Sequence, residues 1–140
     1  TTEIYTLSLH DALPIYVGDQ VLRFVASRLL KQTITGKPYR YGGEEFCLVY
    51  AGRGLPDVSS ELEQLRADIE SCHFDLRQRE RRSLDIAALD PDAGMLSVTV
   101  SIGAAECGAD HAEPWSVLKA ADQALYGAKH AGRNRVNLAG

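Results

Sequence analysis

Apolar residues recur with the period of an α-helix in the first third of the chain. They fall at i, i+1, i+4, i+8 and i+9 and form one stripe, made by Val21, Leu22, Val25, Leu29 and Leu30. The pattern predicts an amphipathic helix that ends before Gly36 and Pro38, because these residues interrupt helices. Asp19 stands just ahead of the stripe, where a carboxylate can cap free backbone N–H groups.

A hairpin is predicted directly after this helix. Two strand-like runs, 39–41 and 46–50, flank the segment Gly42-Gly43-Glu44-Glu45. Because glycine adopts positive φ without steric cost, a Gly-Gly pair between two strands favours a tight turn.

The rest of the chain predicts four more elements. A helix is expected from near Ser60, with Glu63 completing a capping box. Strict alternation over 96–102 predicts a half-buried strand. A last helix is expected between Pro114 and the C′ glycine Gly132, and a short strand at 136–138.

The order helix, hairpin, helix, strand, helix, strand is typical of one α+β domain with a mostly antiparallel sheet flanked by helices. Residues 77–94 are charged and broken by proline and glycine, so we expect an inserted surface loop. Residues 1–15 resemble a translated sequencing-adapter peptide, and we interpret them as a foreign or non-native leader ahead of a domain at 16–140. The alternative is a native edge strand.

Composition narrows the classes of protein to consider. The 140 residues are 45% hydrophobic and carry a net charge of −4, which argues against a nucleic-acid binder and against contact with an anionic membrane by this segment. No apolar run approaches the ~18 residues needed to span a bilayer. The three cysteines show no CxxC spacing, so we expect reduced thiols and a cytoplasmic location.

The hairpin tip is the first candidate for chemistry. Adjacent carboxylates at Glu44 and Glu45, on a rigid turn, offer the hard oxygen ligands that Mg²⁺ bridging phosphates requires. The alternative is a solvated turn with two surface glutamates.

Cations near the end of the last helix are the second candidate. The i, i+4 spacing of Lys129 and Arg133 predicts two cations on one side of the helix, able to grip a polyphosphate. Alternatively, they only complement the helix dipole. Asp19 is either an N-cap or an acceptor for two N–H groups of a guanine edge, and we expect Trp115 and Tyr126 in the core.

Four blocks of the chain resemble the GGDEF diguanylate cyclases. They follow the family order and together span nearly the whole chain from Val17 onward. The blocks are GDQVL (18–22), RYGGEEF (40–46), VTVSIGA (98–104) and ADQALYGAKHAGRNRV (121–136). The resemblance implies a ferredoxin-like fold akin to the polymerase palm and the adenylyl cyclases. It also implies a nucleotidyltransferase that condenses two GTP to cyclic di-GMP.

The same resemblance implies roles for single residues. Glu44 is expected to be the catalytic, metal-binding carboxylate, with Glu45 assisting, at a site that holds two Mg²⁺ ions. The substrate-binding residues are then expected to be Gly42 and Gly43, which leave the nucleotide room, Asp19 at the guanine edge, and Lys129 and Arg133 at the terminal phosphates. The partners implied are GTP, a second copy of the chain in a catalytic homodimer, and a sensor domain upstream.

One departure from the family pattern is large. The DxDxFKxxND segment, which ends the first central strand of the family and supplies a metal-binding Asp, has no match here. We therefore expect an N-terminally truncated, partial GGDEF domain whose first central strand is missing or replaced and whose activity is impaired; Asp11 could mimic the missing Asp. The alternatives are a non-catalytic GTP-sensing or dimerisation module, and, more weakly, a palm fold that acts on another nucleoside triphosphate.

Overall fold

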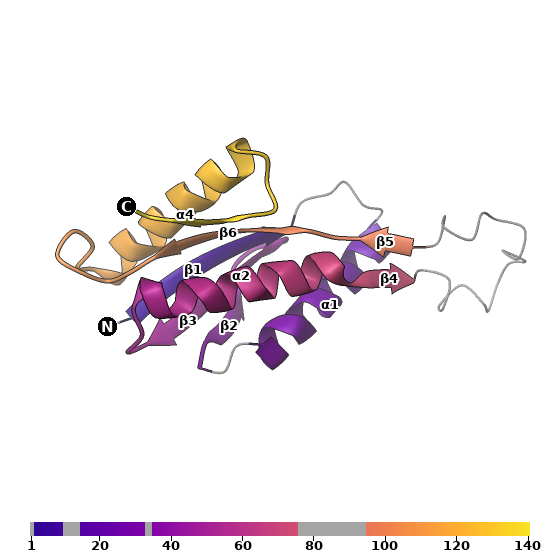
Figure 1. Cartoon of the computed structure of the whole chain (residues 1–140), viewed down its shortest axis with the longest axis horizontal. Helices are drawn as coiled ribbons and strands as arrows, with labels where there is room; N and C mark the ends of the chain where they lie inside the picture. The colour runs from indigo at the N-terminus through magenta and orange to yellow at the C-terminus, as the bar shows by residue number, and fades with distance from the viewer. Residues whose placement is uncertain (1, 10–14, 33–34, 76–94) are drawn as a thin grey trace, which may run out of the picture.

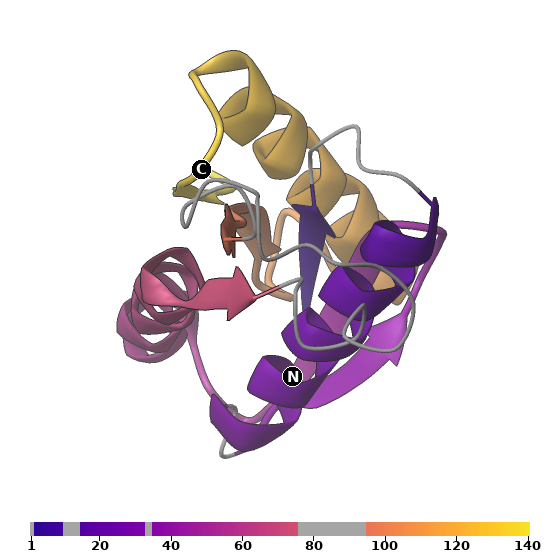
Figure 2. The same cartoon turned by 90° about the vertical axis from the view of Figure 1, so that its right-hand side faces the viewer.

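The chain folds as a five-stranded sheet with helices on both faces (Figures 1 and 2). The computed structural model describes residues 2–9, 15–32, 35–75 and 95–140. The main sheet has the spatial order β2 (Lys37–Arg40), β3 (Glu45–Ala51), β1 (Thr2–Leu9), β6 (Val100–Ala105) and β7 (Val136–Leu138). Its first four strands pair antiparallel, and β7 runs parallel to β6. The α+β class and the mostly antiparallel sheet are confirmed.

Two helices cover one face of this sheet and one helix covers the other. Helices α1 (Ile15–Gln32) and α2 (Leu55–Ser71) share a face, while α4 (Pro114–His130) lies across the opposite face (Figure 2). A small ribbon of β4 (His73–Asp75) and β5 (Met95–Ser97) extends from one end (Figure 1). The loop predicted at 77–94 lies outside the described residues.

Strand β1 fills the centre of the sheet, between β3 and β6. Its register pairs Ser8 with Glu45 on one side and with Ser101 on the other. The N-terminal segment Thr2–Leu9 therefore forms a central strand of the sheet. The leader is thus not an edge strand, whereas its foreign origin and the boundary at residue 15 stay predictions.

Strand β6 is buried on both faces, so the half-buried strand expected over 96–102 is wrong. All six of its residues are buried, including Ser101. Val100, Ile102 and Ala104 join the core under α1 and α2, whereas Ala105 packs with the α4 residues Val117, Ala120 and Ala121. The strand also divides, because residues 98 and 99 separate β5 from β6.

Two helix starts differ from expectation. Helix α1 begins at Ile15, so Asp19 lies within the helix and is not its N-cap. Helix α2 begins at Leu55 instead of near Ser60, with Pro56 in its first turn, and Glu106, just past β6, accepts a hydrogen bond from the Leu55 N–H at 3.1 Å. A carboxylate at this end also complements the helix dipole.

Helix α4 is apolar on one side only. Trp115 and Tyr126 are 72% and 64% exposed, so the expectation that they belong to the core is wrong. The buried side of the helix is made instead by Val117, Ala120, Ala121, Leu125 and Ala128. No helix in the described part of the chain is long and apolar enough to cross a membrane.

Gly103 allows α4 to approach the sheet closely. A Cβ added to Gly103 would collide with the carbonyl oxygen of Ala121 and the backbone nitrogen of Leu125. Backbone atoms cannot move aside as a flexible side chain can, so any larger residue here must push α4 away from β6.

We therefore expect Gly103→Ala to lower the free energy of unfolding by about 1–3 kcal/mol, the usual cost of overpacking a core. Urea unfolding followed by circular dichroism measures it. The matched control is Gly108→Ala, since a Cβ there meets nothing within 4 Å. Equal stability of the two variants contradicts the close approach of α4.

Candidate functional site

The β2–β3 hairpin is closed by its backbone. The N–H groups of Tyr41 and Gly42 both donate to the carbonyl oxygen of Glu45, at 2.8 and 3.2 Å. Neither Gly42 nor Gly43 has a positive φ, so the conformational reason first given for the glycine pair is wrong. A Cβ on Gly43 meets nothing within 4 Å, and one on Gly42 meets only the Glu45 side chain, at 3.8 Å and beyond. The glycines thus leave open space at the exposed tip.

The Arg40 side chain binds the backbone of the turn. Its guanidinium donates to the carbonyl oxygen of Gly42 at 3.2 Å and to that of Gly43 at 2.9 Å. These two hydrogen bonds, called the Arg40 fork below, hold the two peptide groups that precede Glu44. Glu44 itself is exposed at the tip of the hairpin. Arg40 belongs to the RYGGEEF block, but the sequence alone does not indicate these contacts.

Glu45 joins the hairpin to the end of α4. The Lys129 Nζ lies 4.0 Å from the Glu45 Oε1, and both side chains are partly exposed. An exposed pair of this length stabilises the fold little. Its importance is geometric, because it brings the two candidate sites of the sequence, one acidic and one basic, to a common place.

Arg133 lies beyond the helix, so its expected i, i+4 arrangement with Lys129 on one helix is wrong. Helix α4 ends at His130, and Gly132 at φ 113° begins a left-handed turn. The Arg133 N–H donates to the Ala128 carbonyl oxygen at 2.9 Å, which ties the turn to the residue next to Lys129. Among the described residues, no ion pair links Arg133 to a carboxylate.

Asp19 lines a groove on the α1 side of the hairpin, opposite the side on which Lys129 of α4 lies. The groove has a volume of about 450 Å³ and lies between α1 and β2. Its wall combines apolar and polar side chains, namely Asp19, Leu22, Arg23, Ala26, Leu29, Leu30, Pro38, Tyr39, Arg40 and Phe46. Asp19 and Arg23 form an exposed ion pair at 3.3 Å at its rim.

Alternation along β3 explains why one hairpin serves both places. Phe46 lines the groove and joins the core under α1, while the neighbouring Glu45 reaches Lys129 of α4. Successive side chains of a strand point to opposite faces. The hairpin therefore stands between the Asp19 groove and the Lys129 end of α4.

The described residues do not fit a site for two Mg²⁺ ions. Within the described ranges, no three acidic, histidine or cysteine side chains gather as a metal site. The position of β1 that faces Glu45 is held by Ser8, so the sheet brings no carboxylate opposite the hairpin there. Asp11 lies outside the described residues.

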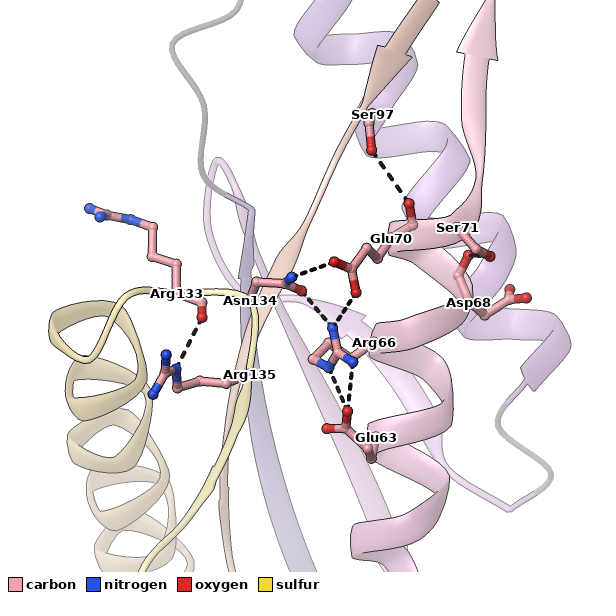
Figure 3. Close-up of polar contacts among 9 residues, drawn as sticks. All are labelled: Glu63, Arg66, Asp68, Glu70, Ser71, Ser97, Arg133, Asn134 and Arg135. Carbon is pink, nitrogen blue, oxygen red and sulfur yellow. Dashed lines mark hydrogen bonds and ion pairs between the residues drawn. The ribbon is translucent and has the colours of Figure 1, made fainter.

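A polar cluster on α2 was not found from the sequence. Arg66 contacts Glu63 at 2.6 Å and Glu70 at 2.7 Å, and it donates to the Asn134 Oδ1 at 2.7 Å (Figure 3). Hydrogen bonds from Arg66 and then from Asn134 hold the pKa of Glu70 below its usual value. The contact between Arg66 and Asn134 spans 68 residues, so no local sequence pattern indicates it.

Comparison with known families agrees with this geometry. The model described as "Diguanylate cyclase, GGDEF domain" matches residues 8–135. The chain belongs to the GGDEF family. The match covers the hairpin, the Asp19 groove and the end of α4 together.

Known GGDEF proteins align over nearly the whole chain. The response regulator PleD of Caulobacter vibrioides is 32% identical over 129 residues, which are 91% of this chain and 26% of PleD. The diguanylate cyclase VdcA of Vibrio cholerae is 36% identical over 131 residues, 92% of this chain and 34% of VdcA. The chain thus spans about a quarter to a third of these relatives.

A solved structure supports the fold. The GGDEF domain of DgcB from Caulobacter crescentus, crystallised with c-di-GMP, superposes with a TM-score of 0.79 at 30% identity and covers 99% of this chain and 77% of that one.

The two hydrogen bonds of Arg40 are expected to keep the hairpin turn closed. We expect Arg40→Ala to speed amide hydrogen exchange at Tyr41 and Gly42 by roughly five- to thirtyfold, since losing its two hydrogen bonds removes about 1–2 kcal/mol of local stability. Exchange followed by NMR measures the effect. The control is Arg23→Ala, because Arg23 pairs with Asp19 of its own helix instead. Unchanged exchange in Arg40→Ala contradicts the role of the fork.

Proposed function

We propose that this chain is the cyclase portion of a diguanylate cyclase, that it binds GTP, and that its own turnover is low. The observation that carries the proposal is the placement of the hairpin between the Asp19 groove and the Lys129 Nζ, which lies 4.0 Å from Glu45. Relatives named as diguanylate cyclases and the c-di-GMP complex of the DgcB domain support it.

The two ends of GTP meet different surfaces in this proposal. The base enters the groove, where the Asp19 carboxylate accepts N–H groups of the guanine edge. The triphosphate lies over the bare glycines of the turn, towards Lys129 and Arg133. Two cations at the terminal phosphates orient the triphosphate and balance part of its charge.

The proposed reaction requires two such sites. The 3′-hydroxyl of one GTP attacks the α-phosphate of the other, forming a phosphodiester and expelling pyrophosphate. The second, reciprocal attack closes the ring and releases a second pyrophosphate. A homodimer with one GTP on each copy supplies both nucleotides, and we propose this assembly for the active form.

Low turnover follows from the metal site. Mg²⁺ supplies charge neutralisation at the attacking and leaving oxygens in two-metal sites, and those sites need several carboxylates. Glu44 and Glu45 come from one turn, and Ser8 holds the facing position of β1. The proposal therefore separates GTP binding, which the described residues support, from efficient chemistry.

The second candidate is a non-catalytic GTP-sensing or dimerisation module. Ser8 opposite Glu45 favours it, because a binding module needs no third carboxylate. The gene sequence upstream distinguishes the two candidates. An intact DxDxFK segment there favours the enzyme, and a Met start near Thr1 favours the module. The cytoplasmic location and the sensor domain stay predictions of the same kind.

The activity assay tests the separation of binding from chemistry. We expect the chain with GTP and MgCl₂ to form cyclic di-GMP at least about 100-fold more slowly than VdcA, since losing ~3 kcal/mol of charge stabilisation costs two orders of magnitude. Chromatography of the nucleotides measures the product. Turnover comparable to VdcA contradicts the argument from the metal site.

Guanine selection tests the groove. Asp19→Ala should lower the preference for GTP over ATP by roughly tenfold or more, because the guanine N–H groups then lose their acceptor. Calorimetric titration with each nucleotide measures the ratio. Asp110→Ala, at an exposed loop position, serves as the control. A preference that survives Asp19→Ala places guanine recognition elsewhere, and a wild-type preference for ATP favours the third reading, a palm fold for another nucleotide.

A further inference from the structure

The turn after α4 has an unusual backbone. Arg133 and Asn134 are consecutive non-glycine residues at positive φ, 62° and 47°, and they follow Gly132 at 113°. Residues with a Cβ are seldom found in this region, although Asn tolerates it better than most. Such a conformation persists only where the surroundings hold it.

The contacts that hold this turn come from α2. The Asn134 Oδ1 accepts a hydrogen bond from the Arg66 Nη1 at 2.7 Å, and its Nδ2 donates to the Glu70 Oε1 at 2.8 Å. Both polar ends of the amide are thus bound, and these bonds also fix which end is oxygen. Arg66 is itself held, because its side chain is only 13% exposed and also contacts Glu63 and Glu70.

Asn134 and Arg133 point in different directions. Figure 3 shows the Asn134 amide directed into the Arg66 and Glu70 cluster, while the Arg133 side chain extends away from it, beyond the end of α4. The Arg133 backbone is bound on both sides: its N–H donates to the Ala128 carbonyl oxygen, and its own carbonyl oxygen accepts from the Arg135 Nε at 3.1 Å. Fixing Asn134 therefore fixes the direction in which Arg133 leaves the turn.

We propose that Asn134, clamped by Arg66 and Glu70 of α2, is a positioning residue that presents Arg133 beside Lys129 to the phosphates of the nucleotide. The inference rests on the proposed function for the phosphate role of Arg133. It adds that α2, which contributes no residue to the Asp19 groove or to the Glu45–Lys129 pair, sets the geometry of the phosphate end. Ligand affinity is gained when a cation is held in its bound position beforehand.

The order of the turn can be measured without any nucleotide. Trypsin cleaves after arginine, so the peptide bond between Arg133 and Asn134 reports how often the turn opens. We expect Asn134→Ala and Arg66→Lys each to raise the rate of cleavage at this bond by tenfold or more, measured by mass spectrometry. Lysine keeps the charge of Arg66 but cannot bridge Glu63, Glu70 and Asn134 at once. Glu63→Gln, which leaves both Asn134 hydrogen bonds in place, is the matched control and should change the rate less than twofold.

Nucleotide affinity then tests the positioning role. Calorimetry with GTP and with GMP, both in MgCl₂, separates the terminal phosphates from the rest of the ligand. Asn134→Ala should weaken GTP binding about as much as Arg133→Ala, by roughly tenfold, and GMP binding by less than twofold. The double variant should lose no more than either single variant, because both act through one contact. Thermal unfolding confirms that each variant is folded, and Asn134→Asp stands in where Arg66→Lys does not fold.

The outcomes distinguish the phosphate role of Arg133 from the positioning role of Asn134. If wild type does not bind GTP, or if Arg133→Ala binds it normally, the proposed function is wrong in that respect and the inference fails with it. If Arg133→Ala weakens GTP binding but Asn134→Ala does not, only the positioning role is overturned. Unchanged trypsin cleavage in Asn134→Ala and Arg66→Lys overturns the clamp itself, whatever the nucleotide results.

Discussion

The place of the basic residues depends on how closely α4 packs against β6. Gly103 has no side chain to keep the helix backbone away, and the small buried residues Ala120, Ala121 and Ala128 lie on the same side of α4. Interiors are packed so densely that a helix held in this way has little freedom to slide or tilt. The last turn of α4 therefore ends at a fixed height above the sheet, and Lys129 in that turn reaches Glu45 of β3.

The hairpin converts this packing into a site with two sides. Arg40 binds the carbonyl groups of Gly42 and Gly43 and also lines the Asp19 groove, so it couples the shape of the turn to the groove wall. Because Glu45 and Phe46 are neighbours on a strand, one faces Lys129 and the other faces α1. A ligand that extends from the groove to the end of α4 must cross the turn, and the bare surface of Gly43 leaves room for that crossing.

The sequence predicted the elements whose bounds depend on neighbouring residues in the chain. The extent of α4 and the C′ glycine Gly132 follow from capping residues and are found as expected. The hairpin is also found where the two strand-like runs predict it, although its glycines do not adopt the positive φ that was the reason given. The start of α2 at Leu55 has a local signal, the proline Pro56 in its first turn, that the expected start near Ser60 did not use, and a distant one, the Glu106 carboxylate 51 residues away, that no local pattern indicates. The core location expected for Trp115 and Tyr126 relied on their large apolar surface, whereas the buried side of α4 is made of smaller residues at helical spacing. The residue types of the site came from the family blocks, whereas the contacts of Asn134 with α2 come only from the tertiary fold.

Binding and chemistry place different demands on this fold. Orienting a triphosphate needs fixed cations and a groove for the base. The Asp19 groove depends on α1 and β3, which pack in one core cluster with β6, and Lys129 depends on α4, which packs in a second cluster with Ala105 of β6. A two-metal centre also needs acidic side chains from a second strand, and β1 is the strand that faces the hairpin. The register places Ser8 there, and a hydroxyl is a far weaker ligand for Mg²⁺ than a carboxylate. The chain thus keeps a five-stranded sheet with β1 at its centre, whereas the β1 residue in register with Glu45 is a serine.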